Sequence, residues 1–494
     1  MKDKYVLTAE SVTEGHPDKL CDTIADAVVD ACLEHDPTAH VACEVMATAG
    51  KIIVAGEITA ARFPDIPAVI CRTVREAGYG GSDYEVEVIT HEQSPDIAGA
   101  VNNGAETGAG DQGIVYGYAC DETPELLPLP VVLAHKLTRL LTQARKLRTI
   151  PGLKPDGKAQ VSVEYQFGVP KRVSAVVVSC QHEDGVELAE LRHAVMRHII
   201  QPAFQDFPLD AETEILINPS GRFVEGGFEA DTGLTGRKLM VDTYGGLAPH
   251  GGGALSGKDG TKVDRSGAYM ARYIAKNIVA AGLAERCTVS LAYAIGKAKP
   301  VMVEVDAHGT GKYSDAVLEQ AVRAVFKLTP NSMIDTLGLD KPIFRKFCNY
   351  GHFTHADAPW ERTDMTEVLE SACHAKEMGG PPADKKTARG LASRCQVLLN
   401  AVLECLAGLK DRSLGSGDFN GRSGGRVFTG AGSTLFCLKG AEANQLDLVP
   451  RLQSSFHGIN ECTQCGVAVL FSKAAGLCHS GEKFRLIHAV FSFV

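Results

Sequence analysis

Apolar residues along the first three quarters of the chain alternate in short segments and recur at helical spacing in longer ones, in three successive rounds. Alternation places every second side chain on one face of a strand, whereas spacing of three and four residues makes one face of a helix apolar. Strand pairs that alternate with helices predict an α+β fold of three similar units, in which helices cover one face of each mixed or antiparallel sheet. The other face must be covered too, so we expect an oligomer. The predicted strands are 40–47, 51–60, 84–92, 114–120, 159–167, 172–180, 214–223, 238–244, 287–295 and 299–307, and the predicted helices are 20–36, 65–79, 129–148, 187–204, 264–284 and 314–328.

Composition limits the classes of protein to which the chain can belong. It has 494 residues, of which 45% are hydrophobic and 22% charged, as in an ordinary globular protein of several domains. No apolar run approaches the roughly 20 residues that span a bilayer. A net charge of −10 argues against nucleic acid as the main partner. Residues 1–19 show no targeting pattern and most cysteines are scattered singly, so we expect a cytoplasmic protein with reduced thiols in its core.

The most informative segment is His250–Arg265, which reads HGGGALSGKDGTKVDR. Glycine lets the backbone turn tightly and bring its N–H groups close to a ligand. Lys258 and Lys262 add charges that suit phosphate oxygens, and Asp259 and Asp264 add oxygen ligands that suit Mg²⁺. We interpret the segment as a binding loop for a metal-bound polyphosphate. The alternative is a glycine-rich surface loop that binds nothing.

A P-loop is excluded at this position, although Gly252-x4-Gly257-Lys258 is similar to one. A P-loop carries Ser or Thr directly after the lysine, where this chain has Asp259. The helix of a P-loop also begins at the lysine, whereas helical spacing begins here only near Asp264.

A second motif, Glu14–Lys19 (EGHPDK), directly precedes the helix predicted over 20–36. Pro17 fits the first turn of that helix, so His16 and Asp18 lie at its N-terminus, where anions are favoured. The alternative is that Asp18 merely complements the helix dipole.

Three further features have weaker signals. Glu44 and Glu57 lie among apolar residues of predicted strands. If these glutamates are buried, each needs a cation or hydrogen-bond donors nearby. The alternative is that each faces outward. Residues 93–113 show little periodicity, which favours a lid over a disordered segment. Residues 155–158 (PDGK) predict a turn.

Together, the motifs resemble those of the S-adenosylmethionine synthetase (methionine adenosyltransferase) family. The similarity runs from about Tyr5 to Asp364, and so many long motifs in one order make it highly specific. One departure is Leu255, where the family usually has Phe; every charged residue around it is in place. The matching motifs are EGHPDK at 14–19, GAGDQG at 108–113, SGRF at 220–223, GLTGRK at 233–238, DTYGG at 242–246, HGGGALSGKD at 250–259, KVDRS at 262–266, and YGHF with PWE within 350–361.

The resemblance implies that ATP, L-methionine and water give S-adenosylmethionine, phosphate and pyrophosphate. It implies two Mg²⁺ ions per site, K⁺, and a homodimer or dimer of dimers with sites shared between subunits. The three units would be related by a pseudo-threefold axis, with flat sheet faces in the dimer interface. The implied domains are 1–100 (N-terminal), 108–225 (central) and 227–368 (C-terminal catalytic), with 369–494 an unassigned extension.

The resemblance also implies a role for each matching site residue. The implied catalytic residues are His16, Lys158, Arg237, Lys238, Lys258 and Lys262. These six are also implied to bind ATP, together with Asp156, Ser220, Gly221, Arg222, Phe223, Asp231 and Ala254. Methionine contacts are implied for Glu57, Gln93, Asp231 and Lys262, Mg²⁺ ligands for Asp18 and Asp264, and a K⁺ ligand for Glu44.

This chemistry fits the residue types present. A thioether sulfur has no proton to lose, so its attack on C5′ of ATP needs no general base, and no Ser/His/Asp or Cys/His signature occurs among the motifs. The protein must align two reactants and stabilise a departing triphosphate. His16 is the predicted donor at the breaking C5′–O bond, and the lid would exclude water.

The remainder of the chain, from about Met378, matches nothing in the family. Residues from Pro381 onward carry 13 Lys+Arg and 8 Asp+Glu, a net charge of +5 against −15 before them, which predicts a boundary near Gly379–Pro382. We expect a helix over 387–409 and no catalytic role for this extension. A zinc site is a weak alternative, at Cys462, Cys465, Cys478 and His479.

Two other functions are weighed against the synthetase. A different ATP-dependent enzyme, such as a kinase, would release ADP. A non-catalytic regulatory homologue would have lost charged site residues, and none of the matching ones is missing.

Overall fold

The structure is a computed structural model that describes residues 4–80, 84–95, 99 and 107–378, together with four short strands between 426 and 491. The chain divides into two compact units, Met1–Asp384 and Lys385–Val494. No helix in the described part of the chain is long and apolar enough to cross a membrane. In the second unit the strands pair in the order β12-β13-β15-β14. Their bounds are Arg426–Gly430 (β12), Ser433–Cys437 (β13), Val469–Leu470 (β14) and Val490–Phe491 (β15).

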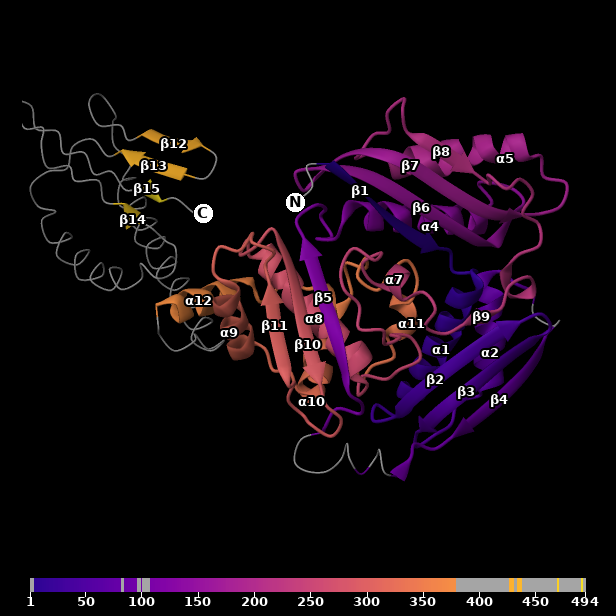
Figure 1. The fold of residues 1–494 in the computed structure, drawn as a ribbon, viewed down its shortest axis with the longest axis horizontal. Helices are drawn as coiled ribbons and strands as arrows, with labels where there is room; N and C mark the ends of the chain where they lie inside the picture. Colours follow the sequence, from indigo (N-terminus) through magenta and orange to yellow (C-terminus); the bar gives the residue numbers. More distant parts are fainter. Residues whose placement is uncertain are drawn as a thin grey trace, which may run out of the picture. The chain divides into compact units, whose positions relative to one another are not determined.

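Three sheets of mostly antiparallel strands form the first unit (Figure 1). The first sheet has the order β4-β3-β2-β9, the second β1-β6-β7-β8 and the third β11-β10-β5. The strands are β1 (Lys4–Val12), β2 (His40–Thr48), β3 (Lys51–Thr59), β4 (Glu85–His91), β5 (Gly113–Cys120), β6 (Leu153–Gln166), β7 (Val169–His182), β8 (Glu214–Ile217), β9 (Gly233–Leu234), β10 (Arg286–Tyr293) and β11 (Met302–Asp306). The predicted α+β class with three sheet-and-helix units is therefore confirmed.

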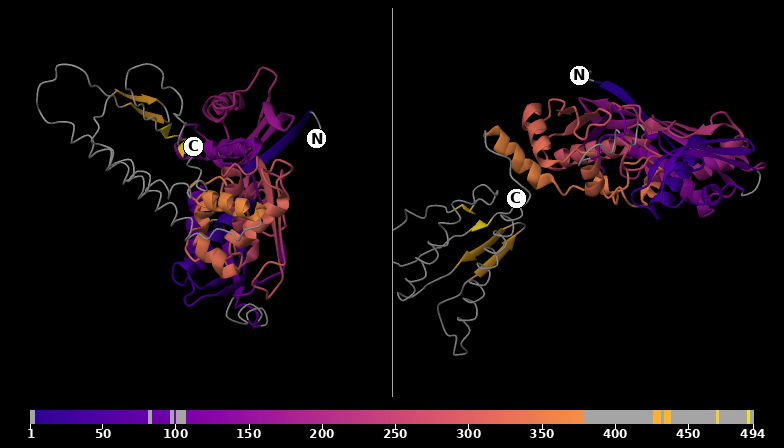
Figure 2. Two further views of the ribbon diagram at one scale, coloured as in Figure 1. Left: turned by 90° about the vertical axis from the view of Figure 1, so that its left-hand side faces the viewer. Right: turned by 90° about the horizontal axis from the view of Figure 1, so that it is seen from below.

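Each sheet contains one strand from a distant part of the sequence. The N-terminal strand β1 pairs along its whole length with β6, β5 pairs with β10, and the short β9 pairs with β2. Figure 2 shows β1, in indigo, beside the second sheet. The three sheets are thus tied together by exchanged strands.

Long helices lie on the sides of the sheets that face one another, around the short α7 and α11 (Figure 1). Helices α1 and α8 contribute to one continuous apolar core with the first and third sheets, and α4 packs on the second sheet over a separate core. The helices are α1 (Pro17–Leu33), α2 (Ile66–Ala77), α4 (Leu129–Lys146), α5 (Leu188–Val195), α6 (Gln201–Ala203), α7 (Leu239–Asp242), α8 (Val263–Ala280), α9 (Asp315–Val325), α10 (Pro330–Leu337), α11 (Phe344–Phe347) and α12 (Thr366–Glu377). Short segments of other helical type are η1 (Met196–Ile200), η2 (Gly227–Glu229) and η3 (Pro359–Glu361).

Two local predictions are wrong. Residues 238–244 form helix α7 and a turn, because the Asp242 N–H donates to the Lys238 carbonyl and the Asp242 carboxylate pairs with buried Lys19 at 2.5 Å. A segment this short has no periodicity that separates strand from helix. Residues 155–158 lie inside β6, where Gly157 pairs with Cys180 after a register shift.

The predicted helix over 187–204 is confirmed but changes type along its length. It continues from α5 through the five-residue π-helix η1 into α6. Pro202, in α6, has no N–H to donate, and π-type turns accommodate a lost helical hydrogen bond.

The nine cysteines between Cys21 and Cys373 are free, and all but Cys71 are buried. The expectation of thiols used as small core residues holds for this part of the chain. The helix predicted over 387–409 and the zinc alternative lie outside the described residues, as do residues 96–98 and 100–106 of the predicted lid.

Candidate active site

His16 lies at the N-terminus of α1, as predicted. It is the N-cap residue, and its ring Nδ1 accepts the Asp18 N–H at 3.2 Å. Pro17 occupies the first turn. Burial of the ring, with only 2% of the residue exposed, lowers the pKa of His16 to about 3, with contributions from nearby Lys238 and Lys158. The imidazole is therefore neutral at physiological pH.

The carboxylate of Asp18 binds one group of β9 and one of the segment that follows it. Its Oδ2 accepts Lys238 Nζ at 2.6 Å, and its Oδ1 accepts the Leu234 N–H at 3.0 Å. Arg237 lies 3.7 Å from Oδ1. Burial opposes the charged form, but the bonds from Lys238 and Leu234 outweigh it and lower the pKa of Asp18. Asp18 thus does more than complement the helix dipole.

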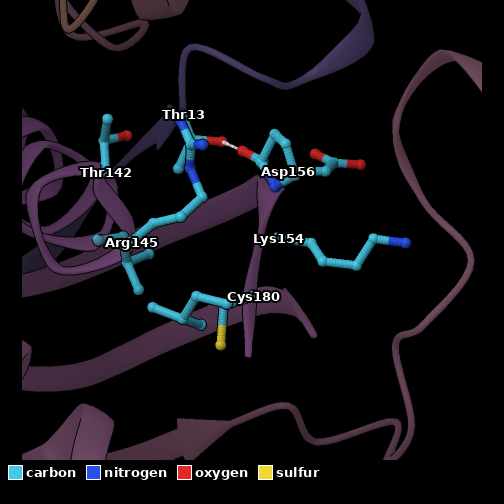
Figure 3. A pocket seen from close by; sticks show the side chains of 9 residues that line it. Thr13, Thr142, Arg145, Lys154, Asp156 and Cys180 are labelled. Atoms are coloured by element: carbon cyan, nitrogen blue, oxygen red, sulfur yellow. Dashed lines mark hydrogen bonds between the residues drawn. The ribbon is translucent and has the colours of Figure 1, made fainter. Parts of the chain in front are cut away.

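Strand β6 brings a cation and a carboxylate to the same place. Lys158 is exposed, whereas Asp156 is buried and accepts the Gly227 N–H at 2.9 Å. Burial raises the pKa of Asp156, which the neighbouring Asp231 reinforces and Lys158 opposes. The other oxygen of Asp156 is buried without a hydrogen-bond partner among the described atoms. A small cavity beside it, lined also by Thr142 and Arg145, has space for about one water molecule (Figure 3).

Residues 220–223 (SGRF) follow the end of β8. This strand ends at Ile217, earlier than predicted, where Asn218 has a positive φ of 41°. The Phe223 N–H donates to His182 Nε2 at 3.1 Å, and the His182 N–H donates back to the Phe223 carbonyl at 2.9 Å. Ser220 and Arg222 remain exposed, and Arg222 forms a surface ion pair with Asp184. The end of β7 therefore holds this loop through its backbone.

The glycine-rich segment 250–265 holds two lysine–carboxylate pairs. Lys258 Nζ lies 2.5 Å from Asp264 Oδ2, and Lys262 Nζ lies 2.8 Å from Asp259 Oδ2. A Cβ atom at Gly253 would lie 2.3 Å from Cγ of Asp264, so the backbone approaches that carboxylate too closely for any side chain. This close approach is to a side chain of the same segment, and the predicted approach to a ligand stays a prediction.

Asp259 has a structural role that the sequence interpretation missed. It is buried, and its Oδ2 accepts the Val41 N–H at 2.6 Å as well as Lys262. It therefore fixes the loop to β2 and has little freedom to bind a metal ion.

Helix α1 joins these two regions. Its Asp22 accepts the Gly236 N–H at 2.8 Å, directly before Arg237 and Lys238. Its Asp26 accepts the Gly257 N–H at 2.9 Å, directly before Lys258. Both were missed, because the helix was analysed for its apolar face. The signal that reveals them is an aspartate at every fourth position, at 18, 22, 26 and 30.

The predicted site residues fall into two groups within one chain. The first group surrounds His16 and Asp18, and the second surrounds Lys258 and Asp264. Ala254 lies between them, since a Cβ at Gly236 would be 2.7 Å from the Ala254 Cβ. Two helical turns, about 12 Å, separate Asp18 from Asp26. Among the described residues, no hydrogen bond or ion pair joins side chains of the two groups directly.

Glu57 and Gln93 come together at one edge of the first sheet. Glu57 lies 3.4 Å from His91 of β4, and the Gln93 N–H donates to Thr59 at 3.2 Å. Glu44, on β2, is exposed as a residue. Partial loss of solvent around its carboxylate nevertheless raises its pKa, which nearby Lys258 opposes. In a single chain both glutamates are at least partly exposed, which agrees with the outward-facing alternative.

Comparisons with known proteins decide the family. Three domain models, described as the N-terminal, central and C-terminal domains of S-adenosylmethionine synthetase, match residues 4–98, 106–223 and 225–362. The chain belongs to the S-adenosylmethionine synthetase family. Proteins named S-adenosylmethionine synthase from Thermus thermophilus and Desulforudis audaxviator are 52% and 50% identical to it over 389 residues. Each alignment covers 75% of this chain and 98% of the relative.

Membership of the S-adenosylmethionine synthetase family establishes the class of activity. The chain is an enzyme, a methionine adenosyltransferase of S-adenosylmethionine biosynthesis. Nearly the whole length of each relative aligns with it, so the three-domain architecture is present in full. About a quarter of this chain has no counterpart in those relatives.

Proposed function

We propose that the two groups of residues anchored on α1 transfer the adenosyl group of ATP to the sulfur of L-methionine. Tripolyphosphate is displaced and then hydrolysed to phosphate and pyrophosphate. One observation carries this assignment of roles: five cationic side chains gather near the proposed metal ligands. Four of them lie on two segments whose backbone helix α1 binds, at Gly236 and Gly257, and the fifth, Lys158, lies on β6. Such an arrangement suits a leaving group with several negative charges, because preorganised cations stabilise the charge that develops on it.

His16 is the proposed donor to the oxygen that leaves C5′. Because Nδ1 accepts the Asp18 N–H, the neutral ring carries its proton on Nε2. The Nε2–H group can donate to the leaving oxygen without ionisation of the ring. No group has to remove a proton from methionine, since a thioether sulfur has none.

The cationic side chains would bind two different parts of the triphosphate. Lys158, Arg237 and Lys238 lie near His16 and would bind the phosphate closest to the breaking bond. Lys258 and Lys262 lie on the glycine-rich segment and would bind the far end of the triphosphate, where hydrolysis follows. Asp156, Asp231, Ala254 and residues 220–223 are the further proposed ATP contacts.

Asp18 and Asp264 would hold two Mg²⁺ ions. Each is a single carboxylate, and among the described residues no group of three or more His, Cys, Asp or Glu side chains could hold a metal ion. A lone carboxylate fits Mg²⁺, which keeps several waters and takes its other ligands from substrate phosphates. Bound there, Mg²⁺ would neutralise phosphate charge. Glu44 is the proposed K⁺ ligand, and its exposed carboxylate is a hard oxygen donor of the right kind.

Methionine is proposed to contact Glu57, Gln93, Asp231 and Lys262. Glu57 and Gln93 lie near the ends of β3 and β4, and among the described residues neither forms a hydrogen bond or ion pair with the residues around His16. We therefore propose a homodimer or dimer of dimers with sites between subunits, formed through the open face of the β2–β3 sheet. We propose a cytoplasmic location because both substrates are small metabolites.

A product assay tests this function. Purified protein with Mg²⁺, K⁺, ATP and L-methionine should form S-adenosylmethionine, phosphate and pyrophosphate in equal amounts, all dependent on methionine, as measured by mass spectrometry and ion chromatography. Formation of ADP would instead identify a kinase-type reaction. Sedimentation velocity would test the oligomer, and a monomer with full activity would exclude a shared site.

A further inference from the structure

Four aspartates of α1 each accept a backbone N–H from a later segment of the chain. Leu234 donates to Asp18, Gly236 to Asp22 and Gly257 to Asp26, whereas Phe344 and Arg345 both donate to Asp30. Spacing of four residues places all four carboxylates on one face of the helix. The helix therefore sets the positions of several loops relative to one another.

Asp26 has the strongest of these arrangements. Both of its oxygens accept Nη2 of Arg265, at 2.6 and 2.7 Å, and its Oδ1 also accepts the Gly257 N–H. Both side chains are completely buried. The guanidinium also stacks on the ring of Phe344, 4.3 Å from its centre. A buried carboxylate that holds one guanidinium nitrogen with both of its oxygens has little freedom to move.

This pair holds the backbone on both sides of the Lys258 Cα atom. Asp26 binds the N–H of Gly257, the preceding residue, and Arg265 Nη1 donates to the carbonyl of Lys258 itself at 2.6 Å. Gly257 has a φ of 81°, and a Cβ atom there would lie 2.0 Å from the Cys43 carbonyl oxygen. The loop is thus fixed closely against β2 at the residue that carries the cation.

We infer that Asp26 and Arg265 are positioning residues for Lys258, which they aim at the phosphate chain of the nucleotide. The inference rests on the proposed role of Lys258 as a phosphate cation. Neither Asp26 nor Arg265 touches substrate, since both are buried behind the loop. Their contribution comes through the backbone, and misplacement of a binding group by about 1 Å can cost a hundredfold in rate.

Asp26→Asn and Arg265→Lys test the inference. Asp26→Asn keeps the shape of the side chain but weakens its ion pair with Arg265. Arg265→Lys keeps a buried ion pair with Asp26 but loses the hydrogen bond to the Lys258 carbonyl. Arg265→Lys should therefore fold even if Asp26→Asn does not. The readouts are kcat, the KM for methionine and the affinity for inorganic tripolyphosphate by calorimetry. We expect kcat to fall about a hundredfold and tripolyphosphate affinity to fall at least about tenfold, with the methionine KM unchanged.

Glu361→Gln is the matched control. Glu361 forms an equally buried ion pair with Arg272 of the same helix α8, in which Nε and Nη2 of Arg272 each donate to one oxygen at 2.9 Å, and it also accepts Lys276 Nζ at 2.6 Å. The other contacts of Arg272 are carbonyls of Tyr118, Glu125 and Leu126, which are not proposed site residues. This variant should lose thermal stability comparably and keep tripolyphosphate affinity. If it loses that affinity equally, the effect of Asp26 is general destabilisation and the inference is wrong.

Lys258→Ala separates failure of the inference from failure of the proposed function. Near-normal turnover of Lys258→Ala would show that Lys258 is not a phosphate cation. If Lys258→Ala is impaired, the double variant with Asp26→Asn should be no worse than Lys258→Ala alone, because one residue acts through the other. Additive losses, or a folded Asp26→Asn with normal tripolyphosphate affinity, would overturn the inference.

Discussion

Lys258 Nζ lies 2.5 Å from Oδ2 of Asp264, so a side chain proposed to bind phosphate is paired with one proposed to bind Mg²⁺. Lys238 and Asp18 form the same kind of pair at 2.6 Å. In both pairs the ammonium group occupies a place next to the carboxylate where a metal ion would bind. Under the proposed function, binding of magnesium and nucleotide together would exchange partners, so that each lysine binds a phosphate and each carboxylate holds the metal. Neither charge would then be unpaired in either state, which would avoid the cost of an isolated buried charge.

Replacement of Lys258 by alanine should lower kcat by a factor of about 100–1,000. The reason is loss of one preorganised donor to the triphosphate, which costs about 3–4 kcal/mol in the barrier. Steady-state kinetics with saturating ATP measure the effect. Lys346→Ala is the control, because Lys346 pairs with Asp357 at the surface, where an ion pair contributes little. Turnover of Lys258→Ala equal to that of the control would exclude the glycine-rich segment as the phosphate site.

Asp18→Asn should lower activity steeply at every Mg²⁺ concentration. The change keeps the size of the side chain but removes the charge that suits a hard cation, and it also leaves Lys238 without its ionic partner. Activity is measured over a titration of Mg²⁺, with Asp206→Asn as a control at an exposed ion pair. Full recovery at high Mg²⁺ would mean that Asp18 is not a required ligand.

Stability should decrease as the pH falls below about 6.5, in part through His135. Burial, reinforced by Arg139, lowers the pKa of His135 to about 3. The unfolded chain takes up this proton near pH 6.5, whereas the folded chain stays neutral until about pH 3. Between these values the unfolded state binds more protons, so the contribution is complete above pH 6.5 and is lost as the pH falls, at about 1.4 kcal/mol per pH unit.

The variant His135→Gln isolates this contribution. Urea unfolding at pH 7, 6 and 5 should show a smaller pH dependence than the unchanged chain, by about 0.7 kcal/mol between pH 7 and 6 and about 1.2 kcal/mol between pH 6 and 5. His193→Gln, at an exposed position of α5, should leave the dependence unchanged. Equal slopes for all three proteins would show that His135 is not buried as a neutral ring.

Local patterns predicted most helices and strands, because apolar spacing depends on neighbours within one element. For example, apolar spacing predicted helices over 20–36 and 264–284, where the structure has α1 and α8. Exchange of β1, β5 and β9 among the sheets was not predictable, since pairing between distant segments leaves no trace in local spacing. The motifs identified the cationic residues, but the sequence did not predict which of them lie close together in space. Asp26 shows why: its role depends on Gly257 and Arg265, more than 200 positions away.

The last prediction concerns the extension, and three observations bear on it. The domain models end at residue 362, the relatives align over 98% of their own length, and the first compact unit ends at Asp384. Every proposed site residue lies before that point. All three sheets of the first unit also take their strands from residues before it.

A chain cut after Gly380 should therefore fold, stay soluble and keep methionine-dependent turnover within about twofold of the full-length protein. The reason is that α12, the last helix of the first unit, ends at Glu377 and keeps its packing against α8 and α9. Thermal unfolding, sedimentation velocity and the product assay are compared for the two chains. A fragment that aggregates would show that the extension covers apolar surface of the first unit. A soluble fragment of unchanged oligomeric state without activity would place part of the site in residues 381–494, and the proposed catalytic set would then be incomplete.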